Sequence, residues 1–379
     1  MKKLGLTIFF DVFALMLLGL TMVMSASSTY SVFKFDSVFY LFNSHLFKVL
    51  LGIGAIILFA SIPYEYYRRF SKPLIIITTI LLIVTLLFAP DIKGAGRWLN
   101  LGIFSIQPAD IAKLILIIHL AVLLEAKANV MDSYRNGFLY FFIWIIGISG
   151  LIILQPNISS GILLIIISLA VIYAGGARFK HILVSILISG VFIGSAAMIF
   201  QHSRSRIFSF VNSITSGGDL NFQVKQALYS LGSGGIFGVG IGNSMQSNLF
   251  LPEAYGDFIF AILGEEFGLI GSIAVLLAYL VFLICGILVA KKSRDMFGQL
   301  LAFGITISIV FYAFVNVAVT TGVFPTTGLP LPFISYGGTS LIFLCISVGI
   351  LINIAFTNHM KQNGVIYVPD QDAVEGIKR

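Results

Sequence analysis

The sequence predicts an all-α, polytopic integral membrane protein with about ten transmembrane helices. The chain of 379 residues is 58% hydrophobic and only 10% charged, and its mean hydropathy is +1.02. Soluble globular domains of this size do not reach such values. The apolar residues also gather in ten runs, each long enough, or nearly so, to cross a bilayer core of about 30 Å as a helix. The distribution of basic residues between these runs is the third observation.

The runs predict one membrane domain over residues 1–360, with a long extracytoplasmic loop at 201–257 and a short cytoplasmic tail at 361–379. One run is longer than a single crossing requires, so we expect its first part to tilt or to lie at the membrane surface. The ten runs lie near residues 5–26, 45–63, 73–89, 108–126, 136–154, 158–175, 181–200, 258–290 (the overlong one), 298–320 and 338–357.

Lysine and arginine are enriched on the cytoplasmic side of membrane proteins, and here they predict the orientation of the chain. With the N-terminus in the cytoplasm, 15 of the 23 Lys and Arg residues fall on that side and 7 on the other, while Lys113 lies within a run. Both termini are therefore expected in the cytoplasm. This topology accounts for the net charge of +7 and leaves no basic soluble face for nucleic acid.

Cysteine and histidine patterns indicate neither a disulfide framework nor a metal site. Cys285 and Cys345 both lie within apolar runs. The 5 histidines are scattered along the chain without the ligand spacing typical of a metal centre. No metal-binding residues are therefore predicted.

The stretch 93–113 is the first of three that interrupt the apolar pattern. Arg97 suits the level of the lipid headgroups, and Asp110 and Lys113 stand at positions i and i+3 on one face of the next helix. The two side chains can neutralise each other within the membrane. Alternatively, Lys113 and Arg97 present positive charge to an anionic group of a substrate.

The stretches 201–257 and 321–340 are the other two. The first is too long for a simple connection, and its glycine-rich part at 232–242 fits no phosphate-loop spacing, so we expect a mobile re-entrant or interfacial loop there. The second contains three prolines and four glycines, which exclude a regular helix. Irregular backbone at membrane depth requires protein or a watery cavity around it. Since all three stretches fall on the outer side, they predict one extracytoplasmic site above a membrane cavity.

Few side chains in these stretches can carry out chemistry. A carboxylate with positive neighbours suits general-base activation of a hydroxyl, while Arg or Lys, with or without Mg²⁺ or Mn²⁺, balances a phosphate leaving group. The candidate carboxylates are Glu253 and Asp257, and the candidate cations are Arg97, Lys113, Arg204 and Arg206.

The position of Asp257 leaves two interpretations open. It directly precedes the overlong run, where capping of the helix is the structural alternative to catalysis. Glu265 and Glu266 lie about 12 Å deeper along the same helix, and we expect them to hold the helices together or to pair with a buried cation. Because nucleotide-activated donors are not ordinarily available outside the membrane, a reaction at Asp257 would use a donor carried on a lipid.

Several motifs in these stretches resemble those of the SEDS family, named for shape, elongation, division and sporulation. The resemblance covers essentially the whole membrane region and is more specific than any one short motif. It is carried by Gly94-Ala-Gly-Arg-Trp-Leu-Asn-Leu-Gly102, Gln107-Pro-Ala-Asp-Ile-Ala-Lys113, Gly234-Gly-Ile-Phe-Gly238, Leu251-Pro-Glu-Ala-Tyr-Gly-Asp-Phe-Ile-Phe-Ala261 and Leu331-Pro-Phe-Ile-Ser-Tyr-Gly-Gly-Thr-Ser340.

This resemblance implies a ten-helix peptidoglycan glycosyltransferase that polymerises lipid II into β-1,4 glycan strands at the outer membrane face during septal wall synthesis. It implies work with a class B penicillin-binding protein, a transpeptidase, and with other divisome membrane proteins. The family's essential aspartate corresponds to Asp257, which would take the proton from the acceptor's 4-hydroxyl. Substrate contacts are expected from Arg97, Asp110, Lys113, Arg206, Glu253 and Ser335.

The chain departs from the family pattern at three positions, and other functions stay open. The family usually has Glu, Asp and Thr where this chain has Asp110, Asn157 and Gly256. The segments 242–246 and 264–266 favour the division branch over the elongation branch. A lipid II flippase would need polar residues along a whole path, and a non-catalytic divisome scaffold would make Asp257 dispensable.

Overall fold

The computed structural model of the chain describes residues 1–379 except 91–95, 101–104, 129–130, 132, 216–219 and 363–379. The described residues fold into helices and one short antiparallel hairpin. In chain order the elements are α1 (Lys2–Phe35), α2 (Tyr40–Ser61), α3 (Glu65–Phe88), β1 (Leu99–Asn100), β2 (Ser105–Ile106), α4 (Pro108–Lys127), the π-helix η2 (Tyr134–Phe138), α5 (Leu139–Leu154), α6 (Ile158–Ala174), α7 (Phe179–Ile199), α8 (Gln201–Thr215), α9 (Phe222–Gly234), α10 (Ile259–Lys292), α11 (Met296–Thr320) and α12 (Ser340–Gln362).

Each of the ten predicted runs is a helix in the structure, so the prediction of an all-α integral membrane protein is confirmed. Among the described residues, seven helices are long and apolar enough to cross a membrane, namely α1, α2, α3, α7, α10, α11 and α12. Helices α5 and α6 are apolar but shorter. Helix α4 has 20 residues and carries Asp110, Lys113, Glu125 and Lys127, which lower its apolar character.

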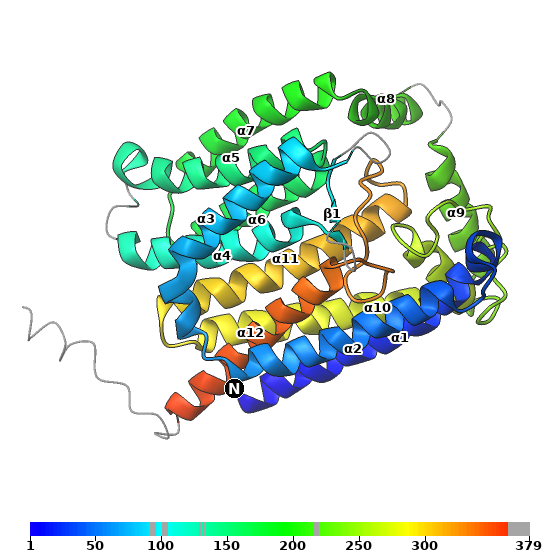
Figure 1. Cartoon of the computed structure of the whole chain (residues 1–379), viewed down its shortest axis with the longest axis horizontal. Helices are drawn as coiled ribbons and strands as arrows, with labels where there is room; N and C mark the ends of the chain where they lie inside the picture. The colour runs from blue at the N-terminus through cyan, green and yellow to red at the C-terminus, as the bar shows by residue number, and fades with distance from the viewer. Residues whose placement is uncertain (91–95, 101–104, 129–130, 132, 216–219, 363–379) are drawn as a thin grey trace, which may run out of the picture.

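The long helices lie side by side along one direction (Figure 1). Helix α12 packs against α2, α10 packs against both α1 and α11, and α3 packs against α4. Helices α8 and α9, the β1–β2 hairpin and the segment 321–339 gather at one end of the bundle, which we call the loop end. The N-terminus lies at the opposite end.

Helices α8 and α9 occupy much of the segment 201–257, and α9 packs along α10. The glycine-rich part is bonded to a break in α10 at Gly268, where φ is 66° and ψ is −163°. The backbone N–H and C=O groups near the break form hydrogen bonds with the glycine-rich segment. Residues 239 and 240 donate to the carbonyls of residues 265 and 266 at 2.9 and 3.1 Å, and residues 269 and 270 donate to those of 235 and 236 at 2.9 and 3.2 Å.

Glycine is required in this contact because the two backbones approach so closely. A Cβ atom on Gly234 would overlap the carbonyl oxygen of Gly264, and one on Gly238 would overlap that of Glu266. The glycines therefore serve packing. A hydropathy pattern cannot distinguish this role from mobility, since both need residues without side chains.

Glu265 and Glu266 are each 2% exposed and hold the glycine-rich segment in place. Glu265 accepts hydrogen bonds from the Ser230 and Ser244 hydroxyls at 2.7 and 2.6 Å and from the Met245 N–H at 3.0 Å. Glu266 accepts from the Ser25 hydroxyl and from the N–H of residue 242. Of the two expected roles, holding the helices together is the one that the described contacts support.

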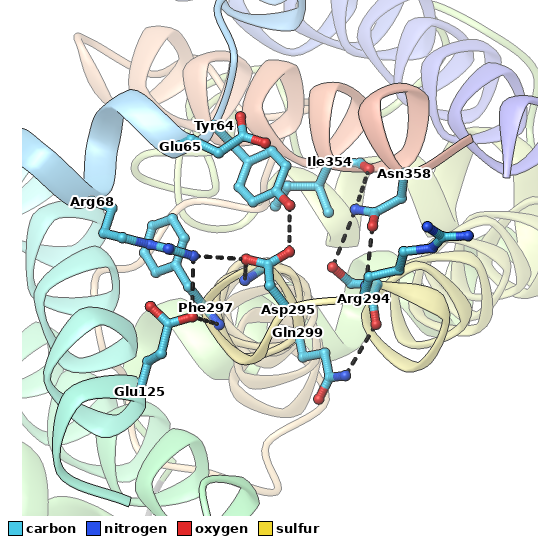
Figure 2. Close-up of polar contacts among 12 residues, drawn as sticks. Tyr64, Glu65, Arg68, Glu125, Arg294, Asp295, Phe297, Gln299, Ile354 and Asn358 are labelled. Carbon is cyan, nitrogen blue, oxygen red and sulfur yellow. Dashed lines mark hydrogen bonds and ion pairs between the residues drawn. The ribbon is translucent and has the colours of Figure 1, made fainter. Parts of the chain in front are cut away.

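The opposite end of the bundle is joined by a polar cluster around Asp295 (Figure 2). The Asp295 carboxylate accepts hydrogen bonds from the Tyr64 hydroxyl and, at 3.0 Å, from Arg68, which also bonds Glu125 at 3.0 Å. Asp295 additionally caps α11 by accepting from the N–H of residue 298 at 3.1 Å. The cluster thus fixes the α10–α11 turn to α3 and α4.

Candidate active site

A cavity of about 740 Å³ opens at the loop end and extends down between α4, α6, α11 and α12. Its upper wall is polar and includes Arg97, Arg206, Gln223, Glu253 and Asp257. Its deep part is lined mainly by the apolar side chains of Leu114, Ile117, Ile305, Ile309, Phe343 and Leu344, together with Ser308 and Ser347. Since Ile305 lies 15 residues before the end of α11, the floor reaches about 22 Å below the loop end.

The β1–β2 hairpin holds Arg97 at the mouth of this cavity. Leu99 pairs with Ile106 in the hairpin, and a Cβ atom on Gly338 would lie 3.0 Å from the ring of Trp98. Trp98 therefore packs directly on the backbone of the 321–339 segment. The Arg97 guanidinium donates to the carbonyl of Pro156 between α5 and α6. Lys93 and the glycine at position 94, which the sequence analysis included in this motif, lie outside the described residues.

Asp257 lies at the cavity mouth near two guanidinium groups. Its carboxylate interacts electrostatically with both Arg97 and Arg206. Arg206 comes from α8 and donates to the Thr326 carbonyl at 3.3 Å. A Cβ atom on Gly328 would lie 3.4 Å from Asp257 Oδ2, so the glycine leaves room beside the carboxylate.

The capping alternative for Asp257 is not supported. The N-cap residue of α10 is Phe258, and no side chain caps this helix. The Asp257 side chain instead faces the cavity, which is where a catalytic carboxylate would have to lie.

Burial lowers the pKa of the Arg97 guanidinium, and the nearby positive charge of Arg206 lowers it further, while the Asp257 carboxylate raises it. Burial likewise lowers the pKa of Arg206, against the opposing effect of Asp257. Both groups keep their charge at neutral pH because the arginine pKa starts above 12. The mouth thus holds two partly desolvated cations together with the carboxylates of Asp257 and Glu253.

Asp110 and Lys113 form an ion pair on α4 with an N–O distance of 2.6 Å. The aspartate therefore reaches Lys113, although its side chain is shorter than the glutamate that the family usually has at this position. The Lys113 ammonium also lies 4.4 Å from the centre of the Tyr312 ring. All three residues line the cavity, so the pair is mutually neutralised and accessible at the same time.

Six of the seven predicted site residues line the cavity, and the seventh, Ser335, does not. Ser335 is 3% exposed, and its hydroxyl donates to the carbonyl of Gly256 at 2.7 Å and accepts from the N–H of Leu331 at 2.8 Å. It does not line the cavity. Arg204 is exposed on α8 and also lies off the cavity wall. The residues that do line it are Arg97, Asp110, Lys113, Arg206, Glu253 and Asp257.

Sequence reasoning missed Tyr312 and Asn316, which stand at i and i+4 on one face of α11. Tyr312 lines the cavity, and Asn316 is 1% exposed beside Asp257. The signal that could have found them is two polar residues at helical spacing in an otherwise apolar run. It is weak, because the same spacing occurs in helices that only pack against one another.

Comparison with known proteins identifies the family. The family model described as cell cycle protein, which covers FtsW, RodA and SpoVE, matches residues 6–360. The chain belongs to the FtsW/RodA/SpoVE family. The expected membership of the SEDS group is thereby confirmed.

Two relatives in this family span nearly the same length as the chain. The probable peptidoglycan glycosyltransferase FtsW of Geobacter metallireducens is 35% identical over 358 residues, covering 93% of this chain and 95% of the relative. Stage V sporulation protein E of Bacillus subtilis is 36% identical over 345 residues, covering 90% and 94%. The sequence is FtsW-like, as the segments 242–246 and 264–266 had indicated.

A solved structure shares the FtsW/RodA/SpoVE fold. A chain of a peptidoglycan synthase complex, described as coordinating polymerization and crosslinking, matches with a TM-score of 0.74 and 23% sequence identity. The match covers 93% of this chain and 97% of that one. At this identity the likeness concerns the fold.

Proposed function

We propose that this protein is a peptidoglycan glycosyltransferase that polymerises lipid II into β-1,4 glycan strands during septal wall synthesis. The observation that carries the proposal is the Asp257 carboxylate near Arg97 and Arg206, at the mouth of a cavity whose deep part is mainly apolar. A site of this kind accommodates a lipid-linked sugar diphosphate, because it offers cations to the phosphates and an apolar space within the membrane. The names of its FtsW relatives support the same reaction.

Asp257 acts as the general base in the proposed reaction. It takes the proton from the acceptor sugar's 4-hydroxyl while that oxygen attacks the anomeric carbon of the donor. The bond between this carbon and the phosphate oxygen breaks, and undecaprenyl diphosphate leaves with the bonding electron pair. One displacement converts an α-linked donor into a β-1,4 link, so a single carboxylate suffices and no covalent sugar–enzyme intermediate forms.

Arg97, Arg206 and Lys113 bind the anionic part of the substrate in this proposal. The two guanidiniums lie beside Asp257, where negative charge develops on the leaving diphosphate, and preorganised cations stabilise such charge. Lys113 lies deeper on the same wall and is oriented by Asp110. Glu253 is the second carboxylate at the mouth and is positioned to accept hydrogen bonds from sugar hydroxyls.

A protein-only metal site does not fit these residues. Among the described residues, no group of three or more His, Cys, Asp and Glu side chains could hold a metal ion. The polar mouth offers two carboxylates, Glu253 and Asp257, so Mg²⁺ or Mn²⁺ would need further oxygen ligands from the substrate's phosphates. No step of the proposed reaction therefore passes through a metal ion.

The loop end is proposed to face the outside of the cytoplasmic membrane, with both termini in the cytoplasm. This orientation follows from the excess of Lys and Arg at the opposite end. We also propose a class B penicillin-binding protein as the partner that cross-links the glycan, together with other divisome membrane proteins. The likeness in fold to a chain of a polymerizing and crosslinking synthase complex supports such an assembly.

The cavity favours a transferase over a flippase. A flippase requires polar groups along the whole membrane crossing. In the described part of the cavity the charged side chains end near Lys113, and the lining below them is mainly apolar, with Ser308 and Ser347 as its polar side chains.

The test is glycan-strand formation from purified lipid II, with the wild type and Asp257→Asn each combined with the cognate penicillin-binding protein. We expect polymer from the wild type and at least about a hundredfold less from a folded Asp257→Asn, because the base is lost. Equal polymer from both would remove Asp257 from the mechanism. Absence of polymer from both, with lipid II crossing vesicle membranes, would establish the flippase instead.

A further inference from the structure

Three consecutive carbonyl groups that end at Asp257 are each held by a hydrogen bond. The Tyr255 carbonyl accepts from the Tyr336 N–H at 2.9 Å, and the Gly256 carbonyl accepts from the Ser335 hydroxyl at 2.7 Å. The Asp257 carbonyl accepts from the Asn316 side-chain amide at 2.7 Å. All three donors come from α11 or from the segment that follows it.

Asn316 makes the contact at Asp257 itself. Its Nδ2 donates one hydrogen to the Asp257 carbonyl and the other to the Leu329 carbonyl at 2.8 Å. The amide thus joins the segment before α10 to the irregular segment 321–339. Asn316 is 1% exposed and does not line the cavity, so its effect on any substrate must pass through the backbone.

The segment that carries Asp257 needs such support because no regular structure fixes it. Helix α10 begins at Ile259, two residues after the carboxylate. Glu253, at the start of the segment, has a φ of 58°, and Phe333 on the facing segment has a φ of 66°. Residues other than glycine seldom adopt such angles, so surrounding contacts must maintain them.

We infer that Asn316 is a positioning residue that holds Asp257 in its productive place near Arg97 and Arg206, with Ser335 as a second support. The kinetic consequence of this inference rests on the proposed function. Ser335 then supports the backbone and does not contact the substrate. A general base must lie within hydrogen-bond reach of its proton, and a displacement of about 1 Å can cost about a hundredfold in rate.

Asn316→Leu tests the inference, with Asn358→Leu as the matched control. Asn358 is also a fully buried asparagine, and its Nδ2 donates to Ser293 Oγ at 3.1 Å and to the Ile354 carbonyl at 2.9 Å. It lies at the opposite end of the bundle, in the cluster of Figure 2. Asn316→Asp and Ser335→Ala are milder variants, to be used if Asn316→Leu does not fold.

The kinetic measurement is lipid II polymerisation per folded protein in the presence of the penicillin-binding partner. We expect Asn316→Leu to lower kcat by about tenfold to a hundredfold while KM for lipid II changes less than about twofold. Asn358→Leu should leave both unchanged. An unchanged kcat in Asn316→Leu, or a raised KM alone, would overturn the inference.

Hydrogen–deuterium exchange tests the same contact without relying on activity. In Asn316→Leu, exchange should rise in residues 253–258 and 326–336 and stay unchanged in residues 293–299, whereas Asn358→Leu should show the reverse. Unchanged exchange in residues 253–258 would refute the positioning role. If wild-type protein makes no polymer, the proposed function fails, and exchange still decides whether Asn316 holds this segment.

Discussion

Replacing Gly238 by alanine should destabilise the protein more than replacing Gly242, although both glycines have nearly the same φ angle. Their φ angles are 82° and 80°. A Cβ atom on Gly238 would overlap the carbonyl of Glu266 and lie 2.7 Å from the N atom of Gly268, while one on Gly242 would meet nothing within 4 Å. Comparing the two alanine variants therefore separates the loss of stability caused by close packing from the loss caused by a positive φ.

The magnitudes follow from these contacts. Alanine at a positive φ costs about 1–2 kcal/mol at either position. At Gly238 the loop must also move away from α10, which weakens the hydrogen bonds from residues 239 and 240 to the carbonyls of 265 and 266. Each such bond contributes about 0.5–1.5 kcal/mol. We expect about 2–5 kcal/mol for Gly238→Ala and about 1–2 kcal/mol for Gly242→Ala.

The assay is unfolding in detergent micelles by titration with a denaturing detergent, followed by circular dichroism. Gly238→Ala should shift the midpoint clearly further than Gly242→Ala, and it should also lower polymerisation, because the bonded segment packs on the part of α10 that follows Asp257. Equal shifts for the two variants would refute the argument that close backbone contact at the Gly268 break stabilises this end of the bundle.

Three further predictions concern charged and polar contacts. Lys113→Met should destabilise the fold by about 3–5 kcal/mol because it leaves the buried Asp110 carboxylate unpaired, and adding Asp110→Asn should recover part of the loss in the same unfolding titration. Polymerisation should fall as the pH is lowered, because a general base must be deprotonated. Arg206→Gln should move this decline to higher pH, since a carboxylate without its positive neighbour binds a proton more tightly. An unshifted pH–rate profile would contradict the electrostatic interaction between Arg206 and Asp257. Tyr64→Phe removes a donor from Asp295 at the opposite end and should cost about 1–2 kcal/mol of stability without changing kcat, as measured by unfolding and polymerisation side by side.

Much of the fold could be predicted from the sequence because membrane insertion depends on local composition. An apolar run of sufficient length becomes a helix whatever lies beside it, since a helix satisfies the backbone hydrogen bonds in lipid within the run itself. The positions of α1 to α7 and of α10 to α12 followed from this rule. The stretches 93–113, 201–257 and 321–340 likewise stood out as departures from it, and residues from all three line the cavity.

The candidate site was only partly predictable, because its details depend on contacts between distant residues. Ser335 has the same local sequence whether its hydroxyl faces a substrate or the carbonyl of Gly256, which lies 79 positions away. The glycines at 232–242 look alike for a mobile loop and for a segment bonded to α10. In both cases the two alternatives have the same composition and spacing, so only the tertiary structure distinguishes them.

The sequence by itself determined that this protein lies in a membrane, where its apolar helices fall and which carboxylate carries the family motif. Only the tertiary structure decided that Asp257 lies near Arg97 and Arg206 and that Asn316 donates to its carbonyl. The physical reason is the range of the interactions. Insertion of a helix into the membrane depends on the hydropathy of neighbouring residues in the chain. A cavity and its hydrogen bonds form only where segments that are distant in sequence meet.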